Sequence, residues 1–280
     1  MEHGLGASGA ISGVMGIFAV RCYFKTMIFP LPILGVFSLI IPLSVKFRVN
    51  SLVVIGLFFL ADLSGGIDQL TGRSFSSVGH WAHVGGMLTG IGFAALLSLG
   101  SEAADERHLD IADTALDTGV GIKAGRASLH RILEKDPDTT EALLSLARME
   151  SRFHACEEAR LAYARCIEVL APSNPERAAS LFEEYFRRYP SCLEARLQYR
   201  LTPHLFMRGN LQLSARTLEV LVASPDTPPE IAEKSLFQLG KVYEAMGLAE
   251  QSRDVYRRYA GRYPDSVVSA KARSKAEGTA

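Results

Sequence analysis

The segment GLGASGAISGVMG, residues 4–16, decides how the first part of this chain folds. It holds five glycines, two alanines and two serines in thirteen residues. Three interpretations are open: a flexible tail, a loop that cradles phosphate, or the closely packed start of a membrane helix. The phosphate loop is disfavoured, because the G-x-x-x-x-G-K-[ST] pattern is absent and the first lysine is Lys25. The composition of the surrounding residues helps to decide between a flexible tail and a membrane helix.

The charge distribution divides the chain into two parts. Of its 30 basic and 30 acidic side chains, only five and three fall within residues 1–100. The 280 residues carry no net charge, but this average combines a part suited to hydrocarbon with a part suited to water. Neither part is basic enough to indicate nucleic acid as a partner.

Three apolar stretches in the first part are each close to the roughly 20 residues that a membrane-spanning helix needs. They are residues 6–24, 51–63 and 83–100. Helices buried in a soluble core are the alternative, which we disfavour because the stretches offer almost no charged face to water. We therefore expect an all-α fold that begins with three transmembrane helices in a lipid bilayer.

The connection at residues 26–50 is also apolar, but Pro30, Pro32 and Pro42 interrupt it. Since proline removes a backbone donor and clashes with the preceding turn, we expect a loop or re-entrant segment at the membrane surface. Its ends carry four basic side chains: Arg21, Lys25, Lys46 and Arg48. By the positive-inside rule this connection is cytoplasmic, so residues 64–79 form an outward loop and the chain beyond residue 101 is cytoplasmic.

This topology places two candidate catalytic side chains at the same depth. Ser8 lies near the outer end of the first span and His83 near the outer end of the third, on helices that run in the same direction. A serine hydroxyl needs a base within hydrogen-bonding reach, and an ionisable residue in a membrane segment is a functional candidate by default. His80 is the second choice for the base, whereas His3 lies in a terminal segment that we expect to be disordered.

Three short motifs resemble those of rhomboid intramembrane serine proteases. Residues 6–13, GASGAISG, resemble the Gly-x-Ser-Gly nucleophile motif of that family. Residues 81–90, WAHVGGMLTG, resemble the His-x-x-Gly-x-x-x-Gly pattern of its last core helix, and residues 61–66, ADLSGG, resemble the outer end of the helix before it. The resemblance covers residues 4–100, and it implies a partial rhomboid-like membrane domain over residues 1–101.

The resemblance implies a dyad in which Ser8 attacks the substrate carbonyl and His83 takes and returns the proton. Small residues let membrane helices approach closely, so glycines should bring the two helices together. The supporting glycines are Gly6, Gly9, Gly86 and Gly90, and Gly13 and Gly16 continue the strip on the first helix. The Ser8 backbone N–H, near a helix N-terminus, would help to hold the oxyanion. Helix packing without chemistry is the alternative interpretation of the same glycines.

Two departures from the rhomboid pattern accompany the motifs. Rhomboid cores have six spans, of which this chain shows the last three, and we expect the other three to be encoded upstream. These helices ordinarily supply histidine and asparagine side chains to the oxyanion site. Ser12 stands where the family often has an aromatic residue packed on the catalytic histidine. We therefore expect this chain to carry the dyad without being a competent protease alone.

Beyond a connector at residues 102–121, the chain shows amphipathic helices separated by short turns. The prolines that close helices are spaced by about the 34 residues of a tetratricopeptide repeat: Pro137 and Pro172, then Pro190 and Pro225, then Pro264. The best-formed repeat is residues 234–266, and residues 141–172 form another. The resemblance extends over residues 122–270 and predicts an α-solenoid over residues 122–280, whose concave face binds a peptide or protein.

Within the solenoid, four tyrosines are expected in the core rather than at a ligand: Tyr163, Tyr185, Tyr243 and Tyr256. The four cysteines show no metal-binding spacing, and we predict neither a metal site nor a cofactor.

Two functions remain. The first is an intramembrane serine endopeptidase that cleaves transmembrane proteins and carries a cytoplasmic interaction domain. The second is a catalytically incompetent, membrane-anchored adaptor. In either case we expect a multi-pass protein of a bacterial inner membrane.

Overall fold

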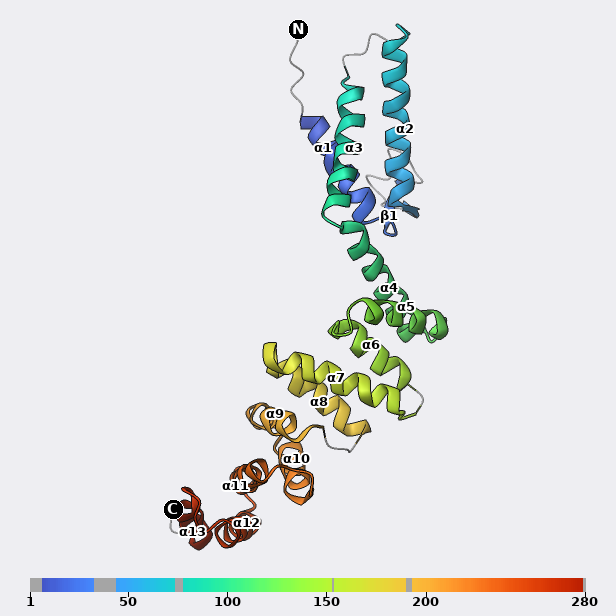
Figure 1. Cartoon of the computed structure of the whole chain (residues 1–280). Coiled ribbons are helices and arrows are strands. Elements are labelled where there is room, and N and C mark those ends of the chain that lie inside the picture. Colours follow the sequence, from blue (N-terminus) through green and yellow to red (C-terminus); the bar gives the residue numbers. More distant parts are fainter. Residues whose placement is uncertain (1–6, 33–43, 74–77, 153, 190–192, 279–280) are drawn as a thin grey trace. The chain divides into compact units, whose positions relative to one another are not determined.

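The computed structural model describes residues 7–32, 44–73, 78–152, 154–189 and 193–278, so His3 and Gly6 lie outside the described residues. The described chain forms thirteen helices and two strands (Figure 1). It divides into two compact units, Met1–Ile111 and Ala112–Ala280, and the division falls inside helix α4.

The first unit contains α1 (Ala7–Arg21), β1 (Thr26–Pro32), β2 (Ser44–Asn50), α2 (Ser51–Leu70), α3 (His80–Leu96) and the first part of α4 (Leu99–Thr118). Its small apolar core joins three helices, with Ala19 of α1, Ile55 of α2 and Met87 of α3 in one buried cluster. The described chain is therefore helical apart from one two-stranded sheet.

That sheet lies in the proline-rich connection. β1 and β2 are antiparallel, with Thr26 opposite Asn50 and Pro30 opposite Lys46. Residues 45–49 alternate apolar and basic side chains, which is the period of a strand, and a two-stranded sheet leaves each strand a free edge that tolerates proline. The predicted loop or re-entrant segment is therefore wrong for both strands. Residues 33–43, with Pro42, lie outside the described residues.

Helix α2 is longer than the apolar stretch at residues 51–63. The Asn50 side chain caps it by accepting a hydrogen bond from the backbone N–H of Leu52 at 2.8 Å, and the helix continues to Leu70. The predicted outward loop at residues 64–79 is therefore helical in its first part. Gly65 and Gly66 lie inside this helix, where the lack of a side chain allows close approach to α3.

Among the described residues, α2 alone is both long and apolar enough to cross a membrane by itself. Helices α3 and α4 pass that test only as a pair, bent by 73° at the break between them. The break includes Ser98, whose φ of 57° is left-handed, so the predicted third span at residues 83–100 ends earlier than expected. Helix α1 is apolar but shorter.

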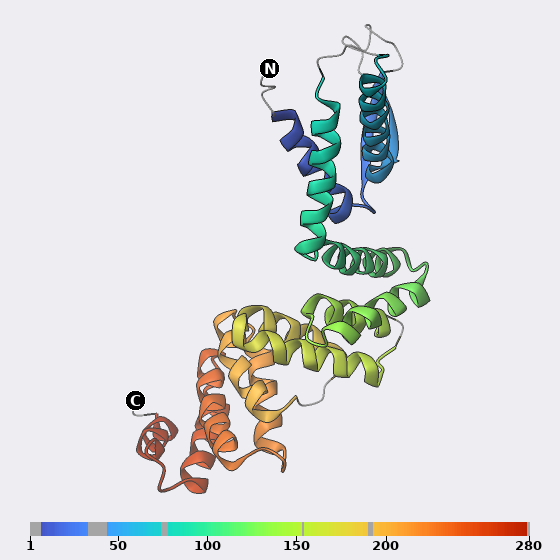
Figure 2. The same cartoon turned by 45° about the horizontal axis from the view of Figure 1, so that its top comes forward.

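Helices α1 and α3 lie side by side and run in the same direction, as Figures 1 and 2 show. Their backbones touch: a Cβ atom added to Gly86 would overlap the carbonyl oxygen of Gly9, and one added to Gly90 would overlap that of Gly13. A Cβ on Gly16 would likewise overlap the carbonyl of Met87. We call this contact the glycine seam. At Gly16, Gly86 and Gly90 it leaves no room for a side chain between the two helices.

Two basic residues, Arg21 at the end of α1 and Lys25 just beyond it, form ion pairs with the middle of α4. The Lys25 ammonium lies 2.9 Å from a Glu106 oxygen and 3.0 Å from an Asp110 oxygen, and Arg21 pairs with Glu106 as well. The hydrogen bonds from Lys25 and Arg21 hold the pKa of Glu106 below its ordinary value. These contacts tie the part of α4 that belongs to the first unit to the end of α1.

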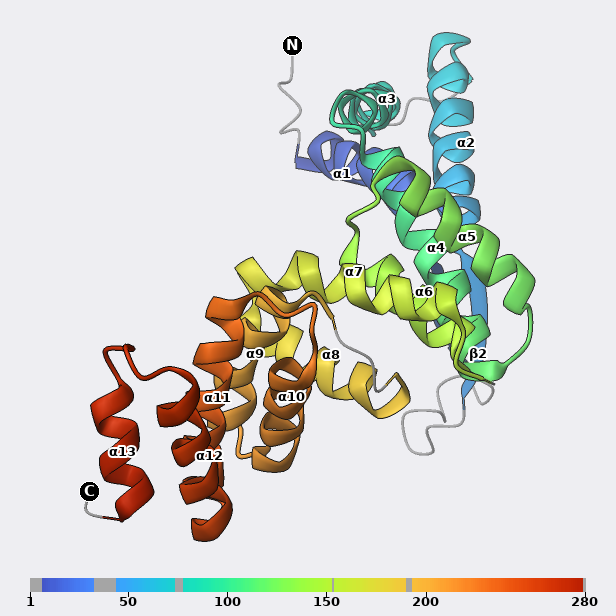
Figure 3. The same ribbon diagram turned by 60° about the horizontal axis from the view of Figure 1, so that its bottom comes forward.

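The second unit contains the rest of α4 and nine more helices: α5 (Ile122–Lys135), α6 (Thr140–Glu150), α7 (Glu157–Ser173), α8 (Pro175–Arg188), α9 (Ala195–Met207), α10 (Leu211–Ala223), α11 (Pro229–Ala245), α12 (Ala249–Arg262) and α13 (Ser269–Glu277). Successive helices pack on one another, and alternate helices also touch, α7 with α9 and α9 with α11 (Figure 3). This is the stacking of a solenoid.

The solenoid core is aromatic. Tyr163, Tyr185 and Tyr256 are fully buried, which confirms their prediction as core residues. Tyr243 is only partly buried and lines a hollow beside α12. Gly240 admits the Tyr256 ring, since a Cβ there would lie 2.6 Å from it.

We expect Gly90→Ala to destabilise the first unit by about 1–3 kcal/mol, the usual effect of overpacking a close contact. Gly92→Ala is the matched control, because it lies on the same helix and an added Cβ would meet nothing within 4 Å. The measurement is thermal unfolding of the full chain in detergent micelles. Equal unfolding midpoints for the two variants would contradict the glycine seam.

Candidate active site

Ser8 lies in the first turn of α1 and is exposed. It precedes the buried Ser12 by one turn, and Ser12 donates a hydrogen bond to the Ser8 carbonyl oxygen at 3.1 Å. Residues four apart share a helix face, so Ser8 continues the face that carries Ser12 and Gly16 into the bundle. As the second residue of the helix, Ser8 also has a backbone N–H without an intrahelical partner.

His83 lies on the matching face of α3. It precedes the buried Met87 by four residues, and it is half-buried, with 18% of its side chain exposed. Its neighbour Ala82 touches α1: a Cβ on Gly9 would lie 3.3 Å from the Ala82 carbonyl oxygen. The glycine seam therefore brings Ser8 and His83 to the same level of two parallel helices.

Asp62 of α2 binds both candidate bases. One carboxylate oxygen, Oδ1, lies 2.8 Å from Nδ1 of His80 and 3.0 Å from Nδ1 of His83. The three side chains are similarly sheltered, with 17–19% of their surface exposed. An ionised carboxylate only accepts hydrogen bonds, so the Nδ1 atom of each ring is placed to donate to it. In the neutral form of this tautomer, Nε2 of His83 keeps its lone pair.

Two glycines of α2 make room for the rings of α3. A Cβ on Gly65 would lie 2.7 Å from Cε1 and Nε2 of His80, and one on Gly66 would lie 3.0 Å from the Trp81 ring. The His80 ring is thus seated with its Nε2 edge against α2. This orientation favours His83 over His80 as the base for a serine on α1.

The structure brings Ser8 and His83 to one level but does not join them. In the part of the chain that it describes, no hydrogen bond links the Ser8 hydroxyl to either imidazole. Catalytic hydrogen bonds are often long before substrate binds, so this geometry is compatible with a dyad and the two roles stay predictions.

Sequence reasoning missed Asp62. The available signal was its charge, since it is one of only three acidic residues within residues 1–100 and follows an apolar run.

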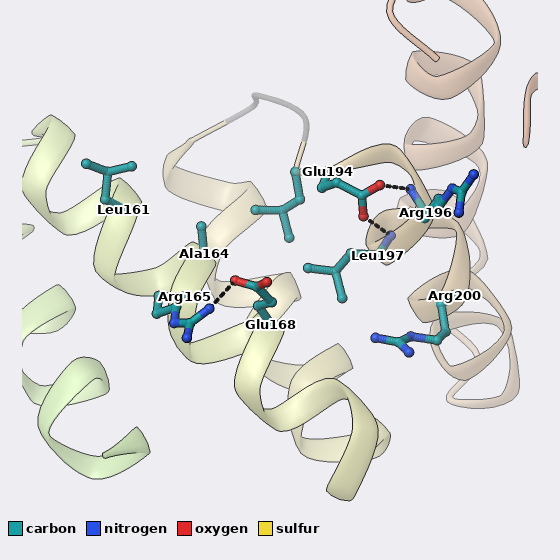
Figure 4. A pocket seen from close by; sticks show the side chains of 9 residues that line it. Leu161, Ala164, Arg165, Glu168, Glu194, Arg196, Leu197 and Arg200 are labelled. Carbon is teal, nitrogen blue, oxygen red and sulfur yellow. Dashed lines mark hydrogen bonds and ion pairs between the residues drawn. The ribbon is translucent and has the colours of Figure 1, made fainter. Parts of the chain in front are cut away.

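A separate hollow of about 790 Å³ lies in the solenoid between α7 and α9 (Figure 4). Its apolar wall includes Leu161, Ala164 and Leu197. The guanidinium groups of Arg196 and Arg200, one turn apart on α9, have no acidic partner among the described residues, and Arg200 points toward α7. An apolar wall beside unpaired positive charge can hold a peptide that has both apolar and acidic side chains.

Models of known families match both parts of the chain. The family model for the Rhomboid domain matches residues 2–100, and that for the Tetratricopeptide repeat matches residues 234–266. The chain joins a rhomboid domain to a tetratricopeptide repeat. The second match coincides with the repeat predicted to be best formed, and the first covers all three motifs of the membrane part. A search of curated proteins and a search of solved structures each found no match.

Rhomboid domains are typical of intramembrane serine proteases, and tetratricopeptide repeats of protein interaction. The rhomboid domain therefore implies a membrane protein whose substrates are membrane proteins, and the repeat implies a protein partner.

Proposed function

We propose that the chain is an intramembrane serine endopeptidase in which Ser8 is the nucleophile and His83 the general base, with a cytoplasmic solenoid that binds a partner protein. The observation that carries the proposal is the glycine seam, which sets the helix of Ser8 against the helix of His83 in parallel and at matching depth. The rhomboid domain supports the same chemistry.

Three spans through the bilayer fit the surface of the first unit. Large apolar side chains are exposed on α1, α2 and α3: Ile11, Val14, Leu52, Val53, Leu57, Phe58, Leu60, Leu88, Phe93 and Leu96. Exposed apolar area of this extent on three neighbouring helices is typical of a surface that faces lipid. Helix α2, with 20 residues, is about 30 Å long and matches the hydrocarbon thickness.

The proposed reaction uses groups whose positions have been described. The Ser8 hydroxyl passes its proton to Nε2 of His83 as its oxygen attacks the substrate carbonyl carbon. The Ser8 backbone N–H donates to the resulting oxyanion. The imidazolium then returns the proton to the leaving amine, and water hydrolyses the ester by the same route. Asp62 acts as a positioning residue, because its hydrogen bond to Nδ1 fixes the ring and keeps the proton off Nε2.

Ser8→Ala and His83→Ala should each lower cleavage of a transmembrane reporter by more than about a thousandfold, since loss of either dyad member removes the nucleophile or its base. The measurement is cleavage in proteoliposomes by the full chain, together with any further spans that its gene encodes. Ser64→Ala, an exposed serine on α2, is the control and should cleave normally. If the unsubstituted chain and both dyad variants cleave equally or not at all, the adaptor function replaces the enzyme for this chain.

Asp62→Asn should lower kcat about a hundredfold with KM nearly unchanged, because misplacing a catalytic group by about 1 Å costs this much. Asp68→Asn, on the same helix, is the matched control. A positioning role also predicts that Asp62→Glu regains part of the lost kcat, whereas a purely structural role would lower the unfolding midpoint in step with the rate. Asp62→Asn cleaving as fast as Asp68→Asn would contradict the role.

For the solenoid, the hollow between α7 and α9 supports a partner that presents an acidic and an apolar side chain together. The unpaired Arg196 and Arg200 supply the charge complementarity, and the leucines supply the apolar surface.

A photo-crosslinking amino acid at Leu161 should capture this partner in cells, and adding Arg200→Glu should weaken the adduct several-fold. The same crosslinker at Met207 is the control, since Met207 is 70% exposed on α9 but does not line the hollow. The adducts are compared by gel mobility and mass spectrometry. Equal adducts at the two positions would contradict a site in the hollow.

A further inference from the structure

Three side chains of the first unit that could bind a metal lie close together: Asp62, His80 and His83. A single base needs one orienting carboxylate, yet here one oxygen of Asp62 faces the Nδ1 atoms of two imidazoles. One ligand atom from each of the three side chains lies within 4.8 Å of the other two. The histidines are three residues apart on α3, the spacing that puts two side chains on one helix face, and the carboxylate comes from the facing helix.

We propose that Asp62, His80 and His83 form a binding site for a divalent transition-metal ion, best matched by Zn²⁺, and that the bound ion blocks proteolysis. The site itself rests only on the three side chains. The inhibition also rests on the proposed role of His83 as the base. Cysteine spacing gave no reason to expect this site, because its ligands are histidines and a carboxylate from two helices.

The donor set and its dimensions select the metal. Two imidazoles and one carboxylate suit Zn²⁺ and its neighbours rather than Mg²⁺ or Ca²⁺, which prefer oxygen. Ligands at about 2.1 Å from a tetrahedral Zn²⁺ are about 3.4 Å apart, so the Asp62–histidine distances need to open by only about half an ångström. The partial exposure of all three side chains leaves a path for the ion and a fourth position for water.

The negative charge of Asp62 favours a cation at this site. His80 is the first residue of α3, where the helix dipole disfavours a cation, and the ionised Asp62 offsets this effect. Beyond this pair of histidines and Asp62, no other group of three metal-ligating side chains comes together in the described parts of the chain.

Metal binding and catalysis exclude each other at the His83 ring. In the state competent for catalysis, Nδ1 of His83 carries a proton for Asp62 and Nε2 is free to accept one. A metal on Nδ1 requires its lone pair, so the proton of the neutral ring moves to Nε2. The ring then has no lone pair for the Ser8 proton. Zn²⁺ would thus hold the enzyme inactive without touching Ser8.

The test is a Co²⁺ titration of the full chain in detergent, with the four cysteines replaced by alanine and without an oligohistidine tag. Co²⁺ in a site of low coordination absorbs visible light more strongly than the hexahydrate, and Zn²⁺ should displace it. We expect one ion per chain. Asp62→Asn and His80→Asn should each weaken binding by more than about tenfold, because loss of even an outer-shell partner costs about 10–100-fold.

His130→Asn, an exposed histidine of α5, is the control and should bind as the parent does. His80→Gln and circular dichroism separate a lost ligand from a misfolded chain. Binding that is equal in the parent, Asp62→Asn and His80→Asn, or absent from the parent, would overturn the proposal.

A second arm measures cleavage. Zn²⁺ should abolish reporter cleavage by the parent and a chelator should restore it, while any activity that His80→Asn retains should resist the same Zn²⁺ concentration. Cleavage by the Zn²⁺-saturated parent at its metal-free rate would overturn the inhibition. If no metal-free chain cleaves, the protease proposal fails while the Co²⁺ titration still decides the metal site.

Discussion

The contact on which the first unit depends is one between backbones. At Gly16, Gly86 and Gly90, the helices α1 and α3 approach until a single added methyl group would overlap a carbonyl oxygen of the other helix. Lipid offers apolar side chains no advantage from burial against one another, so helix association in a bilayer relies on close van der Waals packing. The seam fixes the distance, direction and register of two helices at once. It therefore determines the level at which Ser8 faces the residues of α3.

The second constraint is the shared carboxylate of Asp62. It fixes the rotation of α2 about its own axis, because only one face of that helix presents Asp62, Gly65 and Gly66 to α3 together. A partly sheltered carboxylate is costly unless it is hydrogen-bonded, and the two imidazoles satisfy it. The same oxygen contacts both histidines at once, so Asp62 orients the His80 and His83 rings together. A site that orients a base is in this way also a site that a metal can occupy.

How much of this arrangement the sequence predicts depends on how far apart along the chain the interacting residues lie. Glycine spacing of three and four residues is local, so both strips of the seam could be read from residues 9–16 and 86–90. Asp62 could not be placed in the same way, because its partners are 18 and 21 residues away on another helix and the loop between does not set the rotation of α2.

The hairpin was missed for a different reason. Prolines disfavour a helix, and that signal hid the strand alternation at residues 45–49. The sheet tolerates Pro30 and Pro32 in β1 because its two strands each keep a free edge. The first part of the loop expected at residues 64–79 is instead helical, and within that helix Gly65 and Gly66 receive the rings of His80 and Trp81.

The solenoid packs by the opposite means, because large rings rather than glycines fill its helix contacts. Burial of large rings is favourable there, and each buried tyrosine must still satisfy its hydroxyl. Tyr163 donates to Glu184 at 2.7 Å and Tyr259 to Glu233 at 2.8 Å, so core rings are anchored to acidic groups at the edge of the core. Glycine serves both parts of the chain, but Gly240 clears space for a tyrosine ring whereas Gly86 clears space for a backbone. Glycine thus allows two different kinds of close packing in the two units.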